Sequence, residues 1–102
     1  MASIFHVTRQ DDWTAAVEDG EYRLSTLERT LAEEGFIHCS TAEQVPGTLQ
    51  RFYQGLGDLV RLEIDPELVG AEIRYEGDPE AFPHICGPLP VDAVVAVEPI
   101  SA

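Results

Sequence analysis

Short stretches of alternating apolar and polar residues predict several β-strands along this chain. Residues 59–64 form the clearest one, because Val60, Leu62 and Ile64 all fall on one face. Residues 3–8 alternate in the same way, so His6 and Thr8 share the more polar face of a first strand. Weaker strand patterns occur at 22–24, around 36–38, at 71–76, within 82–90 and at 91–97.

Apolar residues spaced three or four apart predict three helices. The first begins with the acidic pair at 11–12, places Trp13, Ala16 and Val17 on its buried face, and ends near Gly20. Acidic side chains in a first turn and a glycine after the last turn are typical of helix boundaries.

The other two helices are predicted to open with capping boxes, in which a serine is followed three residues later by a glutamate. Ser25 and Glu28 would open the second helix, and Ser40 and Glu43 the third. Pro46 fits only the first turn of a helix, so we expect it to delay the regular start of the third helix. The apolar stripe of that helix consists of Val45, Leu49 and Phe52.

The stretch Gly35–Thr41 joins an apolar strand to a group of chemically capable side chains. Phe36 and Ile37 are residues that a buried strand favours, and the predicted helix start at Ser40 follows directly. Unpaired N–H groups at a helix start attract anions, so the pattern predicts a phosphate or carboxylate site there. The alternative is that His38 is a hydrogen-bonded core residue and Ser40 only a cap.

The order of elements predicts a single compact α+β domain covering residues 1–102. Helices dominate the first half and strands the second, which indicates a mixed or split, largely antiparallel sheet with two or three helices. Regular βαβ alternation and a glycine-rich phosphate loop are both missing from the sequence. This pattern argues against a doubly wound nucleotide-binding fold.

Composition changes the picture mainly through charge. The 102 residues are 44% hydrophobic and carry a net charge of -13, with six arginines, no lysine and 19 carboxylates. Such a chain repels polyanions, which argues against nucleic acids and anionic membranes as partners. There is no apolar stretch long enough to span a bilayer, no secretory signal pattern, and only two cysteines, so we expect a cytoplasmic protein with free thiols.

The three histidines, His6, His38 and His84, each lie on or beside a predicted strand. If those strands are neighbours, the imidazoles converge on one pocket, where general acid–base chemistry is the role that suits histidine best. A zinc site drawing on Cys39 and Cys86, and a Cys–His hydrolase, are weaker alternatives, because no close-spaced ligand pair is present and neighbouring strand residues face opposite ways. We therefore assign no metal, and structural histidines remain an alternative.

Several sequence blocks resemble the small bacterial family known as domain of unknown function 952. The resemblance covers nearly the whole chain. Its most specific blocks are Gly35-Phe36-Ile37-His38-Cys39-Ser40 and Phe82-Pro83-His84-Ile85 followed by Gly87-Pro88-Leu89. This chain departs from the family at Cys86, where an aromatic residue is usual.

That family is distantly similar to the ADP-ribosyltransferase-like fold, a split β-sheet whose cleft binds NAD. The resemblance implies that His6 and Thr8 grip a ribose, that Ser40 and Thr41 lie near the nicotinamide-side ribose, and that His84 lies near a third motif. Glu80 is the acidic residue near that motif, without being a secure match to the catalytic glutamate of the fold.

Taken together, the residues and the resemblance predict a small nucleotide-like ligand, with NAD as a candidate. In this prediction His38 and His84 are catalytic, His6, Thr8, Ser40 and Thr41 bind the ligand, and the reaction is glycosyl or phosphoryl transfer. The alternatives are a non-catalytic module that binds a small ligand and an interaction domain with structural histidines.

Overall fold

Strand β6 (Leu59–Ile64) is the middle strand of the main sheet in the computed structural model, which describes residues 2–27 and 29–100. It pairs antiparallel with β1 (Ile4–Arg9) on one side and with β10 (Val94–Ile100) on the other. The predicted boundaries of β6 and of the first strand are thus confirmed to within a residue. The side chains of Val60, Leu62 and Ile64 are almost fully buried, as the alternation requires.

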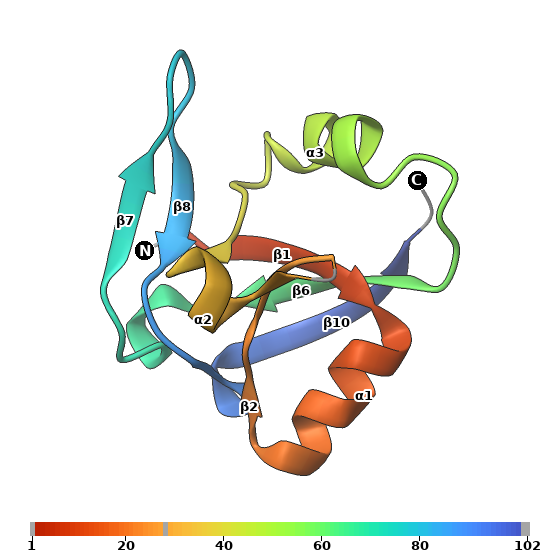
Figure 1. Cartoon of the computed structure of the whole chain (residues 1–102), viewed down its shortest axis with the longest axis vertical. Helices are drawn as coiled ribbons and strands as arrows, with labels where there is room; N and C mark the ends of the chain where they lie inside the picture. The colour runs from red at the N-terminus through yellow and green to blue at the C-terminus, as the bar shows by residue number, and fades with distance from the viewer. Residues whose placement is uncertain (1, 28, 101–102) are drawn as a thin grey trace.

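A second sheet of three antiparallel strands has the order β5-β8-β7. It stands to one side of the main sheet in Figure 1, where β7 and β8 rise as a long hairpin. The two sheets meet where Phe5 of β1 and Ser40 exchange a pair of backbone hydrogen bonds, each 2.7 Å long. The remaining strands form two short pairs, β2-β9 and β3-β4. The bounds of these strands are β2 (Glu21–Tyr22), β3 (Leu24–Thr26), β4 (Arg29–Thr30), β5 (Ile37–His38), β7 (Ile73–Glu76), β8 (Phe82–Ile85) and β9 (Leu89–Pro90).

Within the described residues the α-helices are α1 (Gln10–Asp19), α2 (Leu31–Glu34) and α3 (Val45–Phe52), with short 3-10 turns at Pro66–Leu68 and Val91–Ala93. The molecule is therefore a single α+β domain with mostly antiparallel sheets, as the sequence predicts. Helix α1 buries Trp13 and Ala16 and ends at Gly20, which adopts a φ of 92° that favours glycine. Val17 was wrongly assigned to the buried face, because its side chain is half exposed.

Both sheets contribute to one main core. Ile37 of β5 and Ile85 of β8 are paired across their strands and are completely buried, in the same cluster as Leu62 of β6. A smaller cluster of Val7, Tyr53 and Leu59 lies on the other face of the main sheet. One face of the small sheet is thus committed to the core, which leaves its other face for the site described below.

Both predicted capping boxes were wrong. Ser25 lies in β3 and does not begin a helix, so the first box is not formed there. Its predicted partner, Glu28, lies outside the described residues. The capping box that the chain does use joins Thr30 and Glu33, where the Thr30 hydroxyl accepts from the Glu33 N–H and the Glu33 carboxylate accepts from the Thr30 N–H. The second helix thus begins with a capping box, but at Thr30 and not at Ser25.

The second box is absent because Ser40 has other partners. Its hydroxyl lies 2.9 Å from the hydroxyl of Thr48, and its backbone pairs with Phe5 of β1. Helix α3 begins only at Val45, with Pro46 in its first turn, so the predicted delay is confirmed. The anion site predicted at a helix start beside Ser40 therefore has no helix terminus to support it.

Variants of Ser40 can test whether its hydroxyl bonds to Thr48 or forms a capping box with Glu43. Ser40→Ala leaves the buried Thr48 hydroxyl without its partner, so we expect the free energy of unfolding to fall by about 1–3 kcal/mol. Thr48→Val in the same chain removes the orphaned hydroxyl, and the double variant should recover part of that loss. Glu43→Ala is the matched control and should change stability by less than about 0.5 kcal/mol. Urea unfolding measures all four proteins. A capping box would instead make Ser40→Ala and Glu43→Ala similarly costly, with no recovery in the double variant.

Candidate functional site

The outer face of the small sheet presents aromatic and imidazole rings. Successive side chains of a strand point to opposite faces, so the burial of Ile37 and Ile85 turns Phe36, His38 and His84 outward. The register places His38 directly opposite His84 on the neighbouring strand, and their ring centroids are 5.5 Å apart. The sheet therefore brings together the two residues that the sequence predicts to be catalytic.

His84 is held firmly by its neighbours. Its ring stacks on Phe36 with centroids 3.9 Å apart and an interplanar angle of 11°. Its Nδ1 lies 3.0 Å from a carboxylate oxygen of Glu76 on β7, which can only accept a hydrogen bond, so Nδ1 carries the proton. Stacking and hydrogen bonding together fix the direction of this imidazole.

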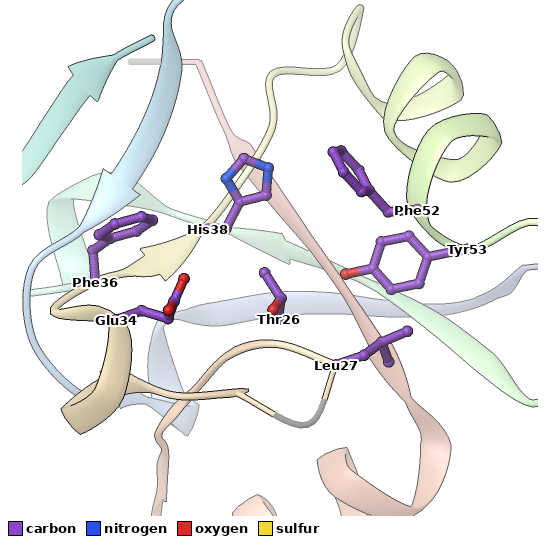
Figure 2. A pocket seen from close by; sticks show the side chains of 7 residues that line it. All are labelled: Thr26, Leu27, Glu34, Phe36, His38, Phe52 and Tyr53. Atoms are coloured by element: carbon purple, nitrogen blue, oxygen red, sulfur yellow. The ribbon is translucent and has the colours of Figure 1, made fainter.

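His38 faces a pocket of about 350 Å³, which we call the His38 pocket. Figure 2 shows its imidazole on one side of this space, with Phe36 and Phe52 to its left and right and the Glu34 carboxylate turned up from below. The residues that line the pocket are Thr26, Leu27, Glu34, Phe36, His38, Phe52 and Tyr53. They come from the β3 hairpin, the end of α2, β5 and the end of α3, so four separate parts of the chain build it.

The His38 imidazole is set up to be neutral at pH 7. Partial burial lowers its pKa from the usual value, and the nearby His84 and Arg51 lower it further. Within residues 2–27 and 29–100, neither ring nitrogen of His38 has a hydrogen-bond partner. An imidazole in this state can accept a proton or a hydrogen bond from a ligand.

Phe52 is an aromatic residue left open to solvent at this pocket. Its side chain is 60% exposed although it is fully apolar. The guanidinium carbon of Arg51 lies 5.8 Å from the Phe52 ring centroid and 5.7 Å from that of Phe82. An exposed aromatic ring beside a pocket is a common feature of ligand-binding surfaces.

Comparison with known proteins gives the family of the chain. Residues 7–97 match the family described as "Protein of unknown function (DUF952)". The chain belongs to this family. Among solved structures, the X-ray structure of protein CC0527 from Caulobacter crescentus is 28% identical, with a TM-score of 0.85, over 96% of this chain and 85% of that one. The solution NMR structure of CC0527 gives a TM-score of 0.81 at 28% identity, over 99% and 86% of the two chains. No curated protein matches.

His6 of this DUF952 domain does not reach the His38 pocket. Its side chain is only 2% exposed, and its Nδ1 lies 2.5 Å from the backbone carbonyl oxygen of His38. Burial lowers the His6 pKa to about 4, so the ring is neutral, and Nδ1 must donate because a carbonyl can only accept. The prediction that all three imidazoles share one pocket is thus wrong, because His6 is buried and His84, although its ring lies 5.5 Å from that of His38, is not among the residues that line the pocket.

The other nitrogen of His6 belongs to a buried polar chain. His6 Nε2 is 2.7 Å from the Tyr22 hydroxyl, which is 2.8 Å from the Thr8 hydroxyl. The Tyr22 hydroxyl donates its one proton to Thr8 and also contacts His6 Nε2, so it links the two residues in one buried polar group. Thr8, predicted to bind the ligand beside His6, is consequently 2% exposed and occupied by Tyr22. The face that looked polar in sequence points inward, and its polar groups bond to one another.

Ser40 and Thr41 also lie apart from the lining of the pocket. The Ser40 side chain is 4% exposed and bonds Thr48, while the Thr41 N–H donates to the Gln44 side-chain oxygen at 3.0 Å. Both residues therefore hold the connection from β5 into α3. Gln44 continues this role by donating to the Ala81 carbonyl at 2.8 Å, which ties the connection to the β7–β8 hairpin.

The cysteines do not form a nucleophile or metal site in this arrangement. Cys39 is 1% exposed, and burial raises the pKa of its thiol, so it remains a neutral core group. The Cys86 Sγ points to the backbone carbonyl of His84 at 3.7 Å. Over the described ranges, there is no cluster of three or more His, Cys, Asp or Glu side chains suited to a metal ion. None of the described helices is long and apolar enough to cross a membrane.

Sequence reasoning missed most of the walls of the His38 pocket. Phe36 was assigned to a buried strand, Phe52 to a helix stripe and Glu34 to no site, yet all three line the pocket. One signal was available for Phe36, because it stands two residues before His38 and so shares its face of the strand. No local pattern connects Glu34 or Phe52 to that face.

The buried state of His6 makes stability depend on pH in a defined direction. The unfolded chain takes up the proton at the ordinary pKa of 6.5 and the folded chain only at about 4. The contribution of neutral His6 to the free energy of unfolding is therefore complete above about pH 6.5. It is lost as the pH falls toward about 4, by about 3 kcal/mol in total. Urea unfolding across this range should show the loss.

Variants separate the His6 contribution from other groups. His6→Gln should be less stable at neutral pH and should lose much less stability on acidification than the unsubstituted protein. His84→Gln serves as the matched control and should keep the acid-dependent loss. Equal acid-dependent losses in the His6→Gln variant and the unsubstituted protein would show that His6 is not a buried neutral imidazole.

Proposed function

We propose that this DUF952 domain binds NAD, ADP-ribose or a related nucleotide-like ligand in the His38 pocket and catalyses glycosyl or phosphoryl transfer there. The observation that carries the proposal is a neutral, unpartnered imidazole facing a pocket walled by aromatic rings, with a second imidazole 5.5 Å away. Flat rings stack between aromatic side chains, and an imidazole neutral at pH 7 is a suitable general base.

The size of the pocket suits one end of a dinucleotide. Its volume of about 350 Å³ lies at the lower end of the range for small-molecule sites, which corresponds to a base with part of its sugar. Arg51 lies beside Phe52 and Phe82 and close enough to His38 to lower its pKa. In this proposal the phosphates lie outside the pocket, where Arg51 can contact them.

The architecture also supports the proposal. The main sheet and the small sheet meet at the Phe5–Ser40 bridge, and this division into two sheets is compatible with the split sheet of the ADP-ribosyltransferase-like fold to which we propose the domain is related. In a glycosyl transfer with NAD, the bond between ribose and the pyridinium nitrogen breaks and its electron pair leaves with nicotinamide. The incoming hydroxyl bonds to the ribose carbon and gives its proton to His38.

A non-catalytic binding module is the second candidate. Glu80 is exposed in the turn between β7 and β8 and does not line the His38 pocket. The acidic residue nearest the third motif is thus not placed to stabilise positive charge on a reacting sugar. This position favours binding without turnover, and the same pocket serves both candidates.

Calorimetry with NAD, ADP-ribose and nicotinamide tests binding, and chromatography of each mixture tests turnover. We expect His38→Ala to weaken binding at least about tenfold, since the pocket loses its one imidazole, while the melting temperature changes little. His84→Ala should weaken binding less and lower the melting temperature, because it loses the Phe36 stack and the Glu76 hydrogen bond.

Phe52 offers a matched comparison. Phe52→Ala removes an exposed ring of the pocket, and Tyr75→Ala removes a similarly exposed ring (60% and 54%) that does not line it. Only the first should weaken binding, and neither should lower stability much. Binding without any product would support the second candidate. If no nucleotide binds, or if Phe52→Ala and Tyr75→Ala behave alike, the proposed use of this pocket is wrong.

A further inference from the structure

Among the described residues that line the His38 pocket, one carboxylate is the only formally charged side chain. Glu34 turns its carboxylate up into the space below His38 (Figure 2). Its ion pair with Arg29 is 3.5 Å long, and the Arg29 side chain is 61% exposed. An ion pair so long and so exposed contributes little, and a carboxylate has acceptor positions for several donors. Glu34 is therefore able to pair with a ligand.

The aromatic walls favour positive charge as well. The face of a phenyl ring carries negative potential, which attracts cations within about 6 Å. At this site the protein shows the effect itself, because the Arg51 guanidinium lies 5.8 Å from Phe52 and 5.7 Å from Phe82. Arg51 is not among the residues that line the pocket, and the His84 ring covers only one face of Phe36, so the Phe52 ring and the other face of Phe36 are what the pocket offers to a ligand.

The other described residues that line the pocket carry no positive charge at pH 7, and Arg51, the nearby cation, lies outside the lining beside the Phe52 and Phe82 rings. His38 is neutral at pH 7, because burial and neighbouring charge lower its pKa, and so it can accept a hydrogen bond without repelling positive charge. Thr26, Leu27 and Tyr53 complete the lining without charge. The net charge of -13 also raises the local concentration of cations around the whole molecule.

We propose that the His38 pocket selects a small, flat organic cation, such as a pyridinium ring, with Glu34 as its counter-ion and Phe36 and Phe52 as its stacking walls. This inference rests on the proposed use of the pocket for a nucleotide-like ligand and narrows it to the charge of the bound ring. It also reverses the preference for an anion that the sequence suggests for this region.

Three pyridines of nearly equal size test the charge directly: 1-methylnicotinamide is a cation, nicotinamide is neutral and nicotinate is an anion. Calorimetry on the full chain at neutral pH should show 1-methylnicotinamide binding about tenfold more tightly than nicotinamide, equal to about 1.4 kcal/mol, and nicotinate binding most weakly. Glu34→Gln should abolish the preference for the cation. Glu18→Gln makes the same change in net charge on the exposed side of α1 and should leave the preference intact.

The results separate this inference from the proposed function. Equal binding of the cationic and neutral rings overturns it, and so does a preference that survives Glu34→Gln or fails equally in Glu18→Gln. Absence of binding by all three pyridines overturns it too. If 1-methylnicotinamide binds through Glu34 while NAD and ADP-ribose do not bind, the cation site stands and the nucleotide function fails.

Discussion

The hydrogen bond from the His6 imidazole to the backbone carbonyl of His38 is the contact on which the rest of the site depends. It joins β1 of the main sheet to β5 of the small sheet through a side chain, beside the backbone bridge between Phe5 and Ser40. Because the carbonyl of His38 is taken up by this bond and Ile37 faces the core, the His38 side chain is directed away from the core. The buried His6 thus positions the half-buried His38.

The energetics of this contact explain why His6 is neutral. A buried imidazolium without a counter-ion would be costly, whereas the neutral ring has both nitrogens paired, one with the His38 carbonyl and the other with Tyr22. Thr8 completes the chain of partners. The two outward imidazoles are in a different situation, since they oppose each other across β5 and β8 and both could not be charged without repulsion. The lowered pKa of His38 is consistent with this. The fold therefore separates one buried, hydrogen-bonded histidine from a pair that lies on the outer face of the small sheet.

Local sequence patterns were sufficient to predict those helices and strands whose structure depends on their own residues. Strand β6 follows from alternation alone, and α1 follows from its acidic start, apolar spacing and terminal Gly20. Local patterns were insufficient where a side chain's hydrogen-bond partner lies far away in the sequence. Three serine- or threonine-to-glutamate patterns fit a capping box equally well, but Ser40 is held by Thr48 and Ser25 lies in a strand, so only Thr30 caps a helix.

The same limit applies to the candidate site. His38 and His84 could be predicted to meet because each lies on a strand of a small domain, and the antiparallel register makes them neighbours. The direction of His6 could not be predicted, since its face of β1 reads as polar until Tyr22 and the His38 carbonyl are seen to satisfy it. Glu34 and Phe52 reach the His38 pocket only through the packing of α2 and α3.

Long-range ¹H–¹⁵N NMR of the three imidazoles, followed from about pH 7 to about pH 4, tests the central contact most directly. If His6 donates to the His38 carbonyl, its ring should remain a neutral Nδ1–H tautomer until about pH 4, while His38 titrates below its ordinary pKa of 6.5. A His6 ring that is protonated on Nε2 alone, or that gains its second proton near pH 6.5, would contradict the hydrogen bond and with it the positioning of His38.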